Sequence, residues 1–108
     1  MMTFDQYYTL LRAMREDDYF PPFLVDKVEL QLRGVIQLLE SGETDLERIQ
    51  KALDDMTRAI NALEEEFEAH DSQLETVARD SIGESVHYIL AWFHIDIDPE
   101  TAIREREW

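Results

Sequence analysis

The sequence contains no cysteine, and this absence excludes several kinds of site at once. Without cysteine there is no disulfide framework, no thiolate zinc site and no thiol nucleophile. Glycine and proline are also scarce, at three residues each, and the isolated glycines cannot form a loop that cradles a phosphate. No run of about 18 apolar residues and no signal-like leader occurs. We therefore expect a cytoplasmic protein without a membrane-spanning segment.

Basic residues are few as well. The sequence has ten Lys and Arg and 25 Asp and Glu, which gives a formal net charge of −15. A surface of this charge repels nucleic acids and anionic membranes and attracts basic proteins. The imbalance is uneven, since residues 64–108 carry 13 acids and 3 bases whereas residues 1–63 carry 12 acids and 7 bases. We predict no nucleic-acid partner and no membrane partner, and we expect the most acidic surface in the second half of the chain.

What the sequence does contain is an apolar pattern with helical spacing. The longest example runs from Thr44 to His70 and places seven apolar side chains along one seam of a helix, which are Leu46, Ile49, Leu53, Met56, Ile60, Leu63 and Phe67. Thr44 and Glu47 have the spacing of a capping box at its start. Such a helix would be about 40 Å long at about 1.5 Å per residue, so other helices must pack on its seam.

Two helices are predicted before this stretch. The first covers about residues 4–16, with Thr3 as N-cap and Gln6 in the reciprocal capping position. The second runs from Pro22 to Glu40, and Gly42 terminates it. Gly34 in the middle of the second helix costs about 1 kcal/mol relative to Ala, and we expect it to permit close approach of another helix.

Two more helices are predicted after it. A second capping-box pattern, Ser72 with Glu75, begins a helix that ends near Phe93. Asp98 then caps a short helix that starts at Pro99, and we expect the residues after it to fold back onto the core through Ile103 and Trp108. Short connections make neighbouring helices antiparallel. The predicted fold is one all-α domain over residues 1–108, an antiparallel bundle of four main helices plus a short C-terminal helix.

The aromatic stretch from Tyr19 to Phe23 contains two consecutive prolines, Pro21 and Pro22. Consecutive prolines force extended backbone before them, so the stretch forms a corner between the first two predicted helices. Three aromatic residues at such a corner have two interpretations. They pack a structural elbow, or they form an exposed aromatic contact site.

Catalytic patterns are weak. Glu84 and His87 have the E-x-x-H spacing that dinuclear carboxylate proteins use twice, but here the spacing occurs once. Glu66 and His70 lie one turn apart but outside the apolar seam, and no serine lies in a nucleophile elbow. The other interpretation of Glu84 and His87 is a solvated pair. We predict no enzyme activity, no cofactor and no metal site.

The feature that stands out is an acidic run, because residues 64–75 hold six acids and no Lys or Arg. Such a run is either a solvated face or a surface that attracts the cations of a partner by electrostatic steering. In the second interpretation the acidic and aromatic residues of the elbow extend the surface. The candidate partner-binding residues are Asp17, Asp18, Tyr19, Phe20, Glu64, Glu65, Glu68, Asp71 and Glu75.

Three segments and the final residue carry a resemblance: Asp-Asp-Tyr-Phe-Pro-Pro-Phe-Leu-Val-Asp-Lys at 17–27, Leu-Glu-Glu-Glu-Phe-Glu at 63–68, Leu-Glu-Thr-Val-Ala-Arg at 74–79, and Trp108. In order and spacing they resemble an uncharacterised family of small acidic all-helical bacterial proteins. The likeness covers most of the chain, although the first predicted helix matches poorly and the ending Arg-Glu-Trp departs from the family's Arg-Asp-Trp. That family has no established activity, so the resemblance implies no catalytic residues.

More loosely, a compact, acidic, cysteine-free helical protein of this size is similar to immunity proteins that neutralise interbacterial effector toxins. We therefore expect a protein that binds a basic toxin and occludes its active site. The alternative is a self-associating structural or regulatory protein, in which Gly34 and the small residues of the fourth predicted helix serve a homodimer. Those small residues are Ala78, Ser81, Gly83 and Ser85.

Overall fold

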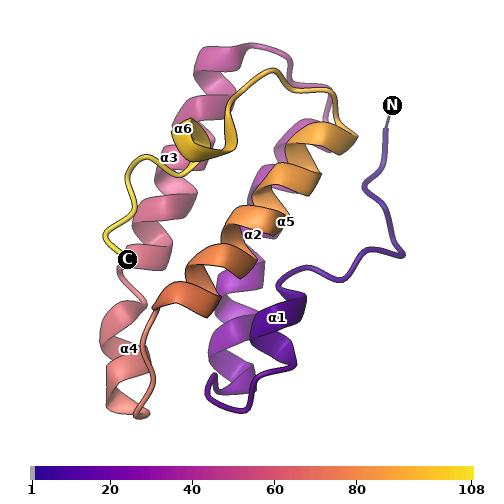
Figure 1. Cartoon of the computed structure of the whole chain (residues 1–108). Helices are drawn as coiled ribbons and strands as arrows, with labels where there is room; N and C mark the ends of the chain where they lie inside the picture. Colours follow the sequence, from indigo (N-terminus) through magenta and orange to yellow (C-terminus); the bar gives the residue numbers. More distant parts are fainter. Residues whose placement is uncertain (1) are drawn as a thin grey trace.

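The computed structural model describes residues 2–108, and no strand occurs among them. The helices are α1 (Arg12–Arg15), α2 (Pro22–Glu40), α3 (Leu46–Asn61), α4 (Glu64–Ala69), α5 (Thr76–Trp92) and α6 (Pro99–Ala102). The all-helical class is confirmed. The four main helices of the predicted bundle are not, since only α2, α3 and α5 are long and the shorter segments lie around them (Figure 1).

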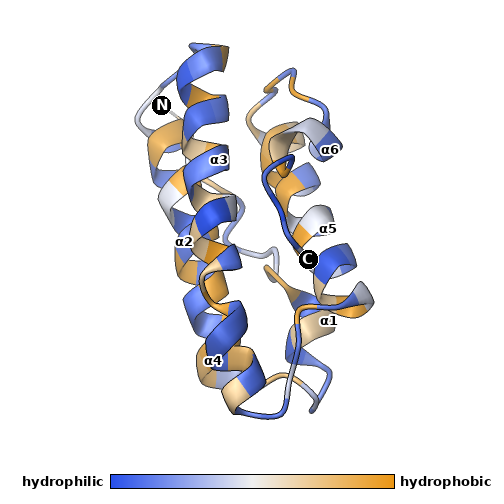
Figure 2. Ribbon diagram, turned by 90° about the vertical axis from the view of Figure 1, so that its left-hand side faces the viewer, coloured by the Kyte–Doolittle hydropathy of each residue, from blue (hydrophilic) through white to orange (hydrophobic). Residues whose placement is uncertain are grey.

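Helix α2 has the predicted bounds, because two residue types fix its ends. Pro22 occupies the first turn, where the missing amide hydrogen costs nothing. At the other end Gly42 adopts a φ of 95° and its amide donates to the Leu39 carbonyl at 3.1 Å. The chain then reverses into α3, which lies beside α2 and runs in the opposite direction (Figures 1 and 2). The antiparallel arrangement predicted for these two neighbouring helices is confirmed.

The predicted first helix over 4–16 is wrong except for its last turn. Residues 3–9 form turns and extended chain along α5, and the Leu11 backbone has a φ of 57° just before α1. The amides of Leu11 and Met14 donate to Ser85 Oγ at 2.9 Å and to Ser81 Oγ at 3.4 Å. The aromatic residues that suggested a helical face therefore pack one ring at a time on α5, and tertiary packing overrides local helix formation.

Packing of the N-terminal segment centres on Phe4, which is buried beside Tyr8, Tyr88, Trp92 and Phe93. The Phe4 amide donates to the Glu40 carboxylate at 2.8 Å, and the Trp92 indole donates to the Thr3 carbonyl at 2.8 Å. The predicted Thr3–Gln6 cap is absent because no helix begins there. Instead, these contacts hold the segment against the ends of α2 and α5.

The predicted helix over 44–70 is interrupted once. Helix α3 ends at Asn61, the Leu63 amide donates to the Ile60 carbonyl at 3.0 Å, and α4 resumes at Glu64. A bond from residue i+3 to residue i tightens the turn, which rotates the following residues about the helix axis. Phe67 then lies fully buried. The start also differs, since Asp45 rather than Thr44 caps α3, and its carboxylate accepts from the amides of Glu47 and Arg48.

The predicted Ser72–Glu75 capping box does not form, and α5 begins at Thr76. Ser72 lies buried instead, and its amide donates to the Phe67 carbonyl at 2.9 Å to close the end of α4. At the other end of the chain the prediction holds, because Asp98 Oδ1 accepts from the Glu100 amide at 2.8 Å and Pro99 begins α6. Ile103 and Trp108 are buried as expected.

Small residues play a different role from the predicted one. A Cβ added to Gly34 would meet no atom within 4 Å. No other helix therefore packs closely at Gly34, and the prediction that this glycine permits close helix approach is wrong. On α5, Ala78, Ser81 and Ser85 are buried within the chain. Ser81 and Ser85 accept the hydrogen bonds of the α1 segment, so this part of the slim face is not available to a second molecule.

Candidate binding surface at the acidic end

Three segments meet at one end of the molecule, namely the loop before α2, helix α4 and the connection from α4 to α5 (Figure 1). Ring contacts join them, because Phe20 lies edge-on to Phe67 with centroids 6.4 Å apart, and Phe23 lies edge-on to His70 with centroids 5.0 Å apart. Lys27 of α2 also pairs with Glu66 of α4 at 2.7 Å. The structure therefore brings the elbow and the acidic run together, although about 40 residues of chain separate them.

The elbow supports both interpretations of its aromatic residues. Phe20 is 3% exposed and belongs to the core, so its assignment to a binding surface is wrong. Tyr19 is 39% exposed and Phe23 is 46% exposed, and both lie at the acidic end. Phe23 was missed by the sequence analysis. The available signal was its position at the start of α2, outside the apolar stripe that Leu24, Val25 and Val28 define.

Tyr19 contacts residues on both sides of it, and its ring lies edge-on to Phe20 with centroids 5.0 Å apart. Asp17 Oδ1 accepts from the Tyr19 amide at 2.9 Å, so the Asp17 carboxylate shapes the turn. Loss of solvent around the Tyr19 hydroxyl, followed by the negative charge of Glu75, raises the pKa of Tyr19. Two predicted site residues that are distant in sequence therefore lie near each other. Asp18 is exposed beside them.

We call the set Asp18, Glu64, Glu65, Glu68, Asp71 and Glu75 the acidic pole. No ion pair formed within residues 2–108 includes any of these side chains. Loss of solvent, with the charges of Glu68 and Glu107, raises the pKa of the Glu64 carboxyl. The acidic pole is therefore a concentration of negative charge that the described chain does not neutralise.

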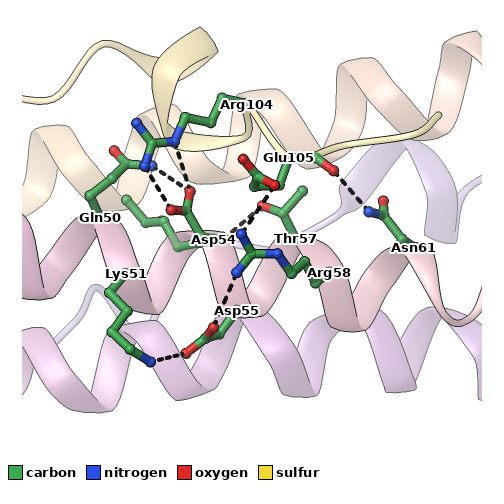
Figure 3. Close-up of polar contacts among 10 residues, drawn as sticks. Gln50, Lys51, Asp54, Asp55, Thr57, Arg58, Asn61, Arg104 and Glu105 are labelled. Carbon is green, nitrogen blue, oxygen red and sulfur yellow. Dashed lines mark hydrogen bonds and ion pairs between the residues drawn. The ribbon is translucent and has the colours of Figure 1, made fainter.

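Three of the ten Lys and Arg residues, Lys51, Arg58 and Arg104, lie in a polar network that sequence reasoning missed (Figure 3). Arg104 donates two hydrogen bonds to Asp54, at 2.8 and 3.2 Å, while Gln50 bridges Asp54 and the Thr101 carbonyl. Arg58 pairs with Glu105 at 3.1 Å. These contacts hold residues 98–108 on α3. A signal was present in the sequence, since polar Gln50, Asp54, Thr57 and Asn61 recur at helical spacing beside the apolar seam.

Metal-binding geometry does not assemble in the described chain. Among residues 2–108 no three His, Asp or Glu side chains converge as a metal site. Glu84 and His87 are exposed on α5. His70 Nδ1 lies 2.9 Å from the Glu66 carbonyl and Glu66 pairs with Lys27, so these two side chains are engaged in other contacts.

No helix in the described part of the chain combines the length and apolar character needed to cross a membrane.

The fold and the surface define an all-helical protein whose most distinctive feature is an exposed acidic and aromatic end. Residues 4–108 match a family of unknown function, DUF5713, and the chain belongs to that family. This confirms the resemblance to an uncharacterised family. No curated protein and no solved structure matches the chain.

Proposed function

We propose that the protein is an immunity protein that acts in the bacterial cytoplasm by binding a basic toxin and occluding its active site. The observation that carries this proposal is the acidic pole, whose carboxylates form no ion pair within the described chain and which lies at the same end of the molecule as the exposed side chains of Tyr19 and Phe23. Uncompensated charge of one sign favours a partner of the opposite sign and accelerates its capture.

The two parts of the surface have different roles in this proposal. Tyr19 and Phe23 are the apolar anchors, because partly exposed aromatic side chains at the centre of an interface contribute much of its binding energy. Glu65, Glu68 and Asp71 pair with Lys and Arg residues that the toxin uses to hold an anionic substrate. Occupying those cations blocks the substrate, so inhibition requires binding and no chemistry.

The test is binding to a basic toxin domain encoded beside the gene, measured by titration calorimetry at two salt concentrations. We expect Glu65→Lys with Glu68→Lys to weaken binding by about tenfold or more, because two attractive charges become repulsive. The matched control is Glu47→Lys with Asp96→Lys, which changes the net charge equally at exposed positions. Glu47 lies in the first turn of α3 and Asp96 in the connection from α5 to α6, and both segments lie at the end of the molecule away from α4 (Figure 1). Equal losses in both double variants, or no binding to any such toxin, would contradict the proposal.

The aromatic anchors have their own control. Tyr19→Ala removes a ring from the proposed interface, whereas Tyr7→Ala removes a ring that is 86% exposed in the N-terminal segment. We expect Tyr19→Ala to weaken binding by about tenfold and Tyr7→Ala to leave it unchanged, since truncation of a central aromatic anchor costs about 1–2 kcal/mol or more. An unchanged affinity for Tyr19→Ala would remove the anchor from the proposal.

A further inference from the structure

The outward face of α5 has a feature that the fold does not require. Gly83 lies in the middle of this helix, where glycine costs about 1 kcal/mol relative to alanine. A Cβ at Gly83 would meet no atom within 4 Å, so no neighbouring element of the chain needs the glycine. Two hollows, of about 370 and 230 Å³, flank this face, and both are bordered by Glu84 and His87.

The exposed residues of this face form a narrow stripe along α5. At about 100° per residue, Thr76, Asp80, His87 and Ala91 point in nearly the same direction, and Gly83 and Glu84 flank that direction on its two sides. All of them are exposed except Gly83, which is half-buried. Neither Asp80 nor His87 forms an ion pair within residues 2–108. The stripe is therefore polar, narrow and unpartnered in the described chain.

The stripe is complementary to itself in the antiparallel direction. A two-fold axis between positions 83 and 84 places Asp80 of one copy opposite His87 of the other, and Thr76 opposite Ala91. The two Asp80–His87 pairs enclose the axis, and the small Gly83 allows the helices to approach closely. We propose that α5 is the self-association surface of this protein and that its occupant is a second copy of the chain, packed antiparallel.

Charge around the stripe makes the association depend on pH. A protonated His87 imidazole forms an ion pair with Asp80 of the other copy, whereas a neutral imidazole donates only an uncharged hydrogen bond, so the contact is stronger when the ring carries charge. The charged and titratable groups that border the same hollows as His87 are Arg79, Asp80, Glu84 and Tyr88 on the same helix, Glu100 and Arg106 of the C-terminal segment, and Tyr8 of the N-terminal segment. Glu100 and Arg106 neutralise each other at 3.1 Å, but the two Glu84 side chains of a dimer repel beside the axis. We expect stronger association at pH 6 than at pH 8.

Exchange of the two charged positions tests the register directly. In sedimentation equilibrium at pH 6, His87→Asp should reduce the association constant by about tenfold, because Asp then faces Asp. Adding Asp80→His should restore the association, since the double variant keeps the net charge and re-forms both pairs with their sides exchanged. A wild-type protein that stays monomeric at pH 6, or a double variant no better than His87→Asp alone, would overturn the proposal.

The second experiment uses a matched pair of glycines. Gly34 and Gly83 both lie within long helices, and neither position has an atom within 4 Å of an added Cβ. Gly34→Gln and Gly83→Gln should therefore both raise the melting temperature, which shows that each variant folds. Only Gly83→Gln should lower the association constant. If both variants associate like the wild type, α5 is not the interface. Neither experiment needs a toxin, so the outcome is independent of the proposed function.

Discussion

Asp54 illustrates how single residues hold the C-terminal segment in place. Its side chain is 10% exposed, and desolvation alone would raise the pKa of its carboxyl. The hydrogen bonds from Arg104 and Gln50, together with the charge of Arg104, outweigh that effect and hold the pKa below its usual range. A lowered carboxyl pKa stabilises the folded state above the pKa of the unfolded chain, and this stabilisation is lost as the pH falls through the folded-state value.

We expect Asp54→Asn to lower the free energy of unfolding by about 1–2 kcal/mol at pH 7, since Arg104 loses its bidentate partner but remains half-exposed. Urea unfolding measures this, and the difference from wild type should shrink below about pH 4, where the carboxyl is protonated in the unfolded chain. The control is Asp55→Asn, whose pairs with Lys51 at 2.9 Å and with Arg58 at 3.6 Å are both exposed and which should cost less than about 0.5 kcal/mol. Equal costs for the two variants would show that the network in Figure 3 does not hold the segment.

At the scale of a single helix, two residues compete as the N-cap of α3, namely Thr44 and Asp45. The sequence favours Thr44 with Glu47, but Asp45 Oδ1 accepts from two amides of the first turn. We expect Asp45→Ala to lower the free energy of unfolding by about 1 kcal/mol and Thr44→Ala to change it by less than about 0.5 kcal/mol. Chemical denaturation of both variants measures the difference. The reverse order would restore the predicted capping box.

The long helices could be predicted because their apolar periodicity and their end signals agree. In α2 the proline at the start, the glycine at the end and the stripe between them all indicate the same bounds. The first predicted helix failed for a physical reason, since its aromatic residues find better partners one by one on α5 than on a shared helical face. Periodicity reports which residues are apolar. It does not report that the amide of Leu11 will use Ser85 as its acceptor.

The site could be predicted only in part for a related reason. A run of carboxylates is visible in the sequence, and so is the aromatic elbow, but their contact depends on the turn at Leu63 that directs Phe67 toward Phe20. Sequence alone did not separate the buried Phe20 from the exposed Phe23. Prolines at 21 and 22 fix a corner there. Which ring points inward is decided by the fold as a whole.

At the scale of the whole molecule, the distribution of cations matters more than their number. The ion pairs of the described chain use basic residues of α1, α2, α3 and the C-terminal segment, and none of them includes a side chain of the acidic pole. The nearby pair of Lys27 with Glu66 lies beside the pole. Like charges that are left together destabilise the folded state. Raised salt should therefore stabilise the isolated protein, while it should weaken the binding of a basic partner.

Glu64→Gln tests this charge imbalance. Loss of solvent and the charges of Glu68 and Glu107 raise the Glu64 pKa, so its stabilising contribution is complete below the unfolded value of about 4.3 and is lost as the pH rises through the folded value. At pH 7 the variant should therefore melt at a higher temperature than wild type, and near pH 3 the two should coincide. Glu65→Gln, at an exposed position on the same helix, should give a smaller gain. A lower melting temperature for Glu64→Gln at pH 7 would mean that the carboxylate is stabilised by its surroundings. The acidic pole would then not be the uncompensated surface that a basic toxin requires.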